Sequence, residues 1–148
     1  MANIVPYSFP VELLKGNHDF VNDTYTISLY TSIAAYSTAS TVFTATGEVS
    51  SGGGSQYAAQ NLTGNAVSNV ANYATVDFTP DPVWGSPTPA TFSALGAAIY
   101  NLSDSNKLVV VLDFGADFSC SNGTFTVTFP APTAGTPSGA DALLSINS

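Results

Sequence analysis

The sequence predicts an all-β protein, either an antiparallel β-sandwich of the jelly-roll type or a partly closed barrel, with one short helix near the N-terminus. Short segments alternate between apolar and polar residues, and turns bearing Gly, Pro and Asn separate them. No repeat of fixed period is evident. Because 148 residues are the usual size of one domain, we expect an extended arm over residues 1–10 and a single β domain over residues 11–148.

The N-terminal arm is the first candidate interface. Pro6 and Pro10 disfavour a helix over residues 1–10, so this segment is expected to be extended. Its apolar side chains are suited to contact with another subunit, which predicts an interface at Ile4, Val5, Tyr7 and Phe9. The following segment, Pro10–Lys15, ends at Gly16 and predicts a short helix.

The clearest predicted strand is Thr24–Tyr30. Its Thr and Ser residues alternate with Tyr, Ile and Leu, so we expect one polar face and one buried face. The Ala-, Ser- and Thr-rich stretch Ser32–Ser40 is expected to form a surface loop, and Val42–Thr46 a short strand. The glycine-rich stretch Ser50–Ser55 predicts a flexible loop between strands, because similar β-type composition flanks it on both sides.

The middle of the chain predicts a hairpin and an edge excursion. Ala58–Leu62 and Ala66–Val70 flank the turn residues Thr63–Asn65 and predict a pair of strands. Tyr73–Phe78 predicts the next strand. Four prolines in Thr79–Pro89 remove backbone donors, so that segment cannot form a central strand and is expected at a sheet edge.

Four further strands are predicted in the second half of the chain: Thr91–Leu95, Ala97–Tyr100, Lys107–Phe114 and Gly123–Phe129. The third of them is apolar on both faces. It is therefore expected to be a central strand that is covered from both sides.

The charge composition excludes several classes of partner. Only 8% of the residues are charged, and two lysines against ten acidic residues give a net charge of −8. A chain with so few cations cannot neutralise phosphates, so we expect no nucleic-acid binding and no attraction to anionic membranes. No apolar run is long enough to span a bilayer, which predicts a soluble protein.

The residues that carry chemistry are few. His18 is the only histidine and Cys120 the only cysteine, so a multi-histidine metal cluster, a structural zinc site of the cysteine type and an intrachain disulfide are excluded. We expect no enzyme activity, no cofactor and no obligatory metal. Two candidate carboxylate pairs are interpreted as turn residues: Asp113 with Asp117, and Asp77 with Asp81.

Trp84 lies between Pro82 and Pro87, which stiffen the segment that carries it. Tryptophan is favoured as an interface anchor, and it equally suits an aromatic plug over one end of a β-core. Both interpretations stay open. Together with Tyr57 or Tyr73, it also allows a carbohydrate-binding module that stacks sugars on aromatic rings.

Segments along most of the chain resemble a family of small β-rich structural proteins of tailed bacteriophages. The resemblance weakens through the proline-rich segment, and the stretches Gly52–Gly54 and Thr133–Gly139 look expanded relative to the family. The matching segments are Glu12–Phe20, Asp23–Ser32, Thr44–Ser50, Gly96–Asn101, Leu108–Gly115 and Ser121–Pro130.

The resemblance implies a structural role in the virion, with capsid decoration or cementing as the first expectation. A tail, adaptor or fibre-base component is the alternative. As implied partners we expect the major capsid protein and further copies of the chain, in a homotrimer on the capsid exterior. Synthesis is expected in the cytoplasm of the bacterial host.

Overall fold

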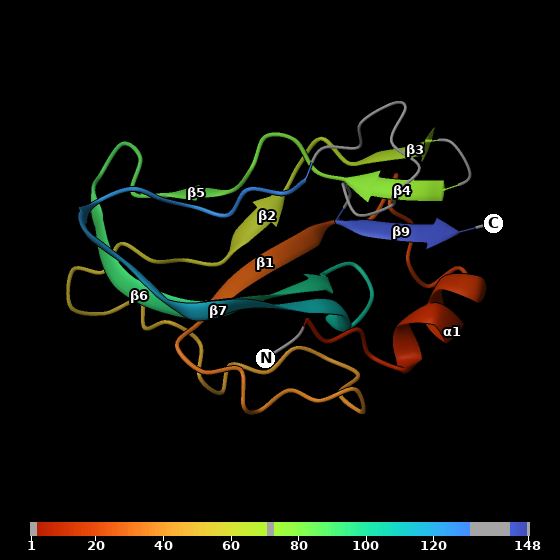
Figure 1. The fold of residues 1–148 in the computed structure, drawn as a ribbon, viewed down its shortest axis with the longest axis horizontal. Helices are drawn as coiled ribbons and strands as arrows, with labels where there is room; N and C mark the ends of the chain where they lie inside the picture. Colours follow the sequence, from red (N-terminus) through yellow and green to blue (C-terminus); the bar gives the residue numbers. More distant parts are fainter. Residues whose placement is uncertain (1–2, 71–72, 131–142, 148) are drawn as a thin grey trace.

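The computed structural model describes residues 3–70, 73–130 and 143–147, and within them the chain forms one helix and nine strands (Figure 1). The elements are α1 (Ser8–Leu14), β1 (Tyr25–Tyr30), β2 (Gln60–Leu62), β3 (Ala66–Val70), β4 (Tyr73–Asp77), β5 (Val83–Trp84), β6 (Ala90–Asn101), β7 (Lys107–Gly123), β8 (Phe125–Thr126) and β9 (Leu144–Asn147).

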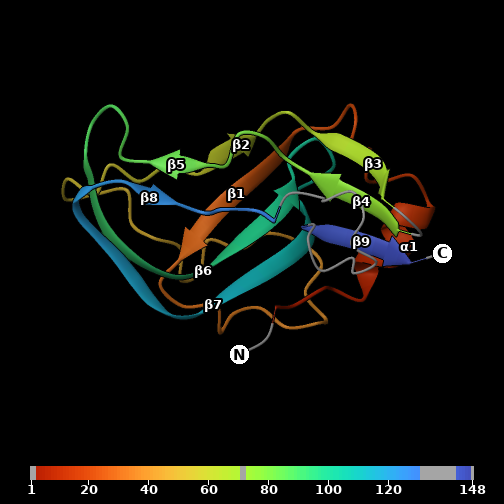
Figure 2. The ribbon, with the colours of Figure 1, turned by 45° about the horizontal axis from the view of Figure 1, so that its top comes forward.

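The strands form two layers. A four-stranded sheet of order β2-β1-β6-β7 makes one layer, and the sheets β3-β4-β9 and β5-β8 lie over it (Figures 1 and 2). All neighbouring strands are antiparallel. The all-β prediction with one short helix is confirmed, and among the described residues the sheets do not close into a barrel.

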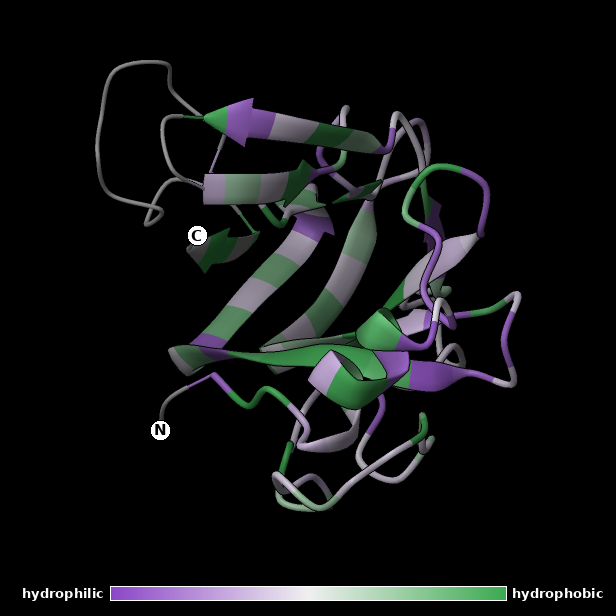
Figure 3. Cartoon of the chain, turned by 90° about the vertical axis from the view of Figure 1, so that its right-hand side faces the viewer, coloured by the Kyte–Doolittle hydropathy of each residue, from purple (hydrophilic) through white to green (hydrophobic). Residues whose placement is uncertain are grey.

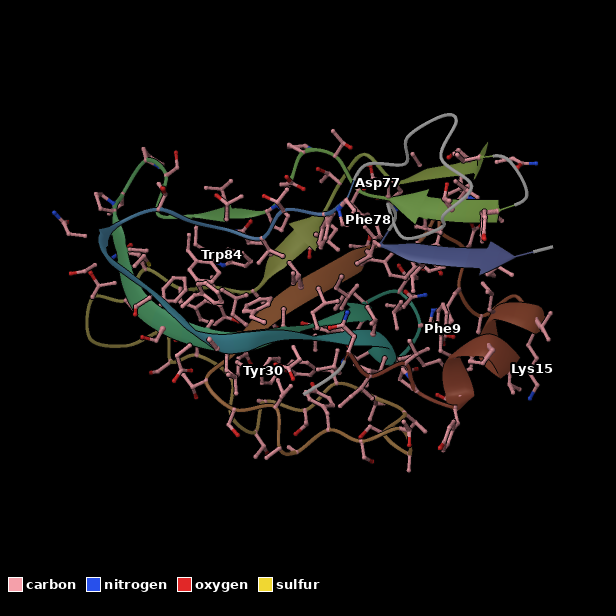
Figure 4. The ribbon with its side chains drawn as sticks, in the orientation of Figure 1. Phe9, Lys15, Tyr30, Asp77, Phe78 and Trp84 are labelled. Carbon is pink, nitrogen blue, oxygen red and sulfur yellow. The ribbon has the colours of Figure 1, made fainter. Side chains whose placement is uncertain are left out.

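The main core fills the space between the layers. Trp84 is 2% exposed and Phe78 is 1% exposed, and both lie between the layers in Figure 4. Ile27, Leu29 and Ile99 of the four-stranded sheet pack in the same cluster and are fully buried. These large apolar side chains supply most of the free energy that holds the layers together.

A second, smaller core covers the other face of the four-stranded sheet. The long loop of residues 31–59 crosses that face and brings Tyr36 against Tyr30. The hydroxyl groups of both tyrosines donate to the carbonyl oxygen of Thr44. Because of this cover, Thr26 and Ser28 are buried as well, which corrects the expectation that the first strand has one exposed polar face.

The first helix begins at Ser8, two residues earlier than predicted, so residues 8–10 are not part of an extended arm. Pro10 occupies the third helical position, where the backbone N–H would have no partner within the helix, so the proline is tolerated there. Gly16 ends the turn with a φ of +76°, as the sequence predicted.

The predicted strand Lys107–Phe114 is buried but not central. It belongs to the 17-residue strand β7, which lies at the edge of its sheet next to β6. Two other segments cover this edge: Ile4 forms a two-way backbone pair with Val111, and Val42 forms a bridge with Lys107. An apolar strand at an exposed edge invites aggregation, and this cover protects it.

Several strands differ from the prediction. The segments predicted as a hairpin separate, because β2 pairs with β1 whereas β3 pairs with β4. The predicted strands 91–95 and 97–100 are one strand, β6. The expected strand Val42–Thr46 makes only an isolated bridge, and strand β9 was not predicted.

Candidate interaction surface

An apolar groove separates helix α1 from the three-stranded sheet β3-β4-β9. It has a volume of about 500 Å³, and among the described residues that line it Thr75 alone is polar. Figure 3 looks onto this end of the molecule, with green bands marking apolar residues on the helix and on the strands. Because its described lining is almost wholly apolar, we treat the groove as the candidate site.

The sheet wall of the groove follows from the strand register. Val67 of β3 lies opposite Val76 of β4, which in turn lies opposite Leu144 of β9. Cross-strand partners share one face, so these three side chains form a row. Ala74 and Ile146 form a second pair on the same face. Val67 is 53% exposed, so this face is only partly covered.

The helix wall follows from helical spacing. Phe9 and Leu13 are four residues apart, as are Pro10 and Leu14, so the side chains line up along one side of α1. Phe9 is buried at the floor of the groove, whereas Leu14 is 90% exposed and Val5 also lines the groove. Contiguous exposed apolar surface of this kind is typical of interaction sites and of ligand-binding grooves.

A buried histidine, His18, contacts residues of helix α1. The ring of His18 packs against Phe9 and Tyr25, and its Nε2 lies 3.3 Å from Oε2 of Glu12. Burial lowers the pKa of His18, while the hydrogen bond to Glu12 and the nearby charge of Asp104 act in the opposite direction. The desolvation effect is the largest, so the imidazole is neutral in the folded protein at neutral pH.

The five predicted interface residues occupy different environments. Tyr7 is 72% exposed and Val5 lies at the groove, so both are available for contact. Ile4 is half-buried in its backbone pair with β7. Phe9 is 6% exposed at the floor of the groove, and Trp84 is 2% exposed, so Trp84 has the environment of an aromatic plug in the core.

Trp84 is part of the hydrophobic core. Its indole Nε1–H donates to the carbonyl oxygen of Ala58 at 2.7 Å, and its ring packs against Tyr57 and Phe125. Tyr57 is also buried, and Tyr73 is half-buried on β4. The aromatic rings considered for sugar stacking therefore do not form a joint exposed platform.

In each of the two candidate carboxylate pairs, one aspartate bonds to a backbone group. Oδ1 of Asp113 accepts from the N–H of Gly115 at 2.8 Å, and Oδ1 of Asp81 accepts from the N–H of Phe129 at 2.9 Å. Within residues 3–70, 73–130 and 143–147, no group of three His, Cys, Asp or Glu residues is placed to hold a metal ion. No helix in that part of the chain is long and apolar enough to cross a membrane.

Comparison of the chain with protein-family models, with curated proteins and with solved structures finds no match.

Proposed function

We propose that this protein is a structural component of a tailed-bacteriophage particle, and that it decorates and cements the outside of the capsid. The observation that carries the proposal is the apolar groove between α1 and the β3-β4-β9 sheet, with Leu14 almost fully exposed on its rim. A chain with this surface gains stability when a partner covers it. The sequence resemblance supplies the class of partner, the major capsid protein.

The charge distribution supports an outer position. The net charge of −8 repels packaged DNA, so contact with the genome is electrostatically unfavourable. Lys107 pairs with Oδ2 of Asp104 at 2.6 Å, which leaves Lys15 at the outer end of α1 as the other lysine (Figure 4). Binding at three-fold positions of the shell would bring together a homotrimer.

Binding of purified protein to purified capsids tests the role of the groove. Leu14→Asp places a charge on the groove rim without opening a cavity, because Leu14 is 90% exposed. We expect this variant to fold normally and to lose co-sedimentation with capsids. Leu102→Asp is the matched control, since Leu102 is 47% exposed in the turn after β6. Equal binding by both variants would contradict a role for the groove.

A further inference from the structure

A second open surface lies between the outer part of β7 and the returning segment that contains β8. It is a cleft of about 460 Å³. Phe114 and Phe118 line it from β7, and residues 124–128 line it from the other side. Phe118 is 53% exposed, and its ring lies 6.3 Å from that of Phe114.

Among the described residues, the backbone of the segment 124–128 has no partner on the side of this cleft. On its other side it pairs with β5: Phe125 lies opposite Trp84, and the N–H of Val127 donates to the carbonyl oxygen of Pro82. In an antiparallel pair, backbone groups point alternately toward and away from the partner strand. The N–H and C=O groups of Thr126 and Thr128 therefore point toward the cleft.

The side chains around this edge suit an added strand. Thr124, Thr126 and Thr128 are exposed, while Phe125 is half-buried and lies 6.3 Å from Phe114. An extended peptide beside the edge could form backbone hydrogen bonds and place its alternate side chains on the phenylalanine rings.

Charge favours a basic occupant. No described residue that lines the cleft is a lysine. The whole chain has only two lysines and carries a net charge of −8. A second copy of the chain would bring the same negative charge, whereas a segment with lysine or arginine residues would be attracted.

We propose that the cleft between β7 and β8 is a strand-addition site, which takes an extended, basic segment of a different polypeptide with alternating apolar residues. This inference does not depend on the capsid role, because the cleft and the α1 groove have no lining residue in common.

The probe is a synthetic peptide in which three valines alternate with two threonines between terminal lysines. Titration into the isotope-labelled full chain is expected to shift the amide signals of Thr126 and Thr128 saturably. The same peptide with N-methyl groups at the valines and the threonines cannot donate backbone hydrogen bonds from these residues, whichever edge of the peptide faces the site. We expect it to bind about tenfold more weakly or worse. Equal binding of both peptides, or no saturable shift, would overturn the proposal.

A pair of variants locates the site. Phe118→Ser removes an exposed ring at the cleft and is expected to weaken peptide binding about tenfold, in line with loss of one large apolar contact. Val21→Ser changes a residue that is 68% exposed in the loop after α1 and is expected to bind the peptide like the unchanged protein. Undiminished binding by Phe118→Ser would place the peptide elsewhere and contradict the assignment.

Discussion

At the residue scale, two residues that the sequence suggested as interface anchors lie in different environments. Trp84 is 2% exposed and donates a buried hydrogen bond, whereas Tyr7 is 72% exposed. Trp84→Ala is expected to lower the free energy of unfolding by about 3–5 kcal/mol through cavity formation. Tyr7→Ala is expected to change it by less than about 0.5 kcal/mol. Denaturant unfolding measures both, and similar losses would contradict the placement of Trp84.

The ionisation of His18 links pH to folding. Burial holds its pKa below the ordinary value of 6.5, so the unfolded chain binds a proton more readily than the folded one. The stability from neutral His18 is complete above pH 6.5 and is lost as the pH falls through that value toward the folded pKa.

His18→Gln should therefore show a smaller loss of stability than the unchanged protein between pH 7 and pH 5, as measured by urea unfolding. Titration of the His18 ring by NMR is the direct control. If the pKa of His18 in the folded protein were above 6.5, protonation of His18 would stabilise the fold as the pH falls, and this prediction would be contradicted.

At the element scale, the sequence predicted strand positions better than strand pairing. Alternation located the strand Tyr25–Tyr30 within one residue, because periodicity is a local property. The burial of both its faces depends on the loop 31–59, which follows the strand and folds back over the sheet. No local pattern in the sequence reveals that path. The turn residues within 58–70 predict one hairpin. The two strands of this region instead pair with β1 and β4, and the local sequence does not contain that information.

The candidate surface was only partly predictable. The sequence indicated the apolar arm, and Val5 and Tyr7 are available for contact. The groove itself combines α1 with a sheet whose third strand, β9, lies near the C-terminus. Leu144 and Ile146 alternate there, but so short a segment gives a weak signal on its own.

Packing between β6 and β7 makes Gly96 hard to replace. A Cβ atom at this position would lie 2.5 Å from the carbonyl oxygen of Leu112 and 2.9 Å from Cγ2 of Ile33. Gly96→Ala is therefore expected to cost about 1–3 kcal/mol through overpacking.

Gly52→Ala is the control for this substitution, because the nearest atom to its added Cβ lies 3.6 Å away in an exposed loop. Thermal unfolding of both variants gives the comparison. An unchanged melting temperature for Gly96→Ala would contradict the close approach of the two strands.

At the scale of the whole molecule, the protein combines a low content of charged residues with two open apolar surfaces. The α1 groove and the β7–β8 cleft leave apolar residues in contact with water. In the particle, partners of different sequence would cover both surfaces. In the isolated protein the α1 groove stays open, and its burial in a closed assembly of copies would remove the risk of aggregation. We therefore expect the isolated protein to self-associate into trimers at high concentration, which light scattering coupled to gel filtration measures.

The position of the protein in purified phage particles tests the central claim most directly. Reconstruction of the particles by electron microscopy, combined with counting of the protein by quantitative mass spectrometry, is expected to show it on the outer face of the capsid shell in many symmetric copies. The α1 groove should contact the coat protein in that reconstruction. Density confined to the tail or the portal would contradict capsid decoration, and absence of the protein from the particles would contradict a structural role in the virion.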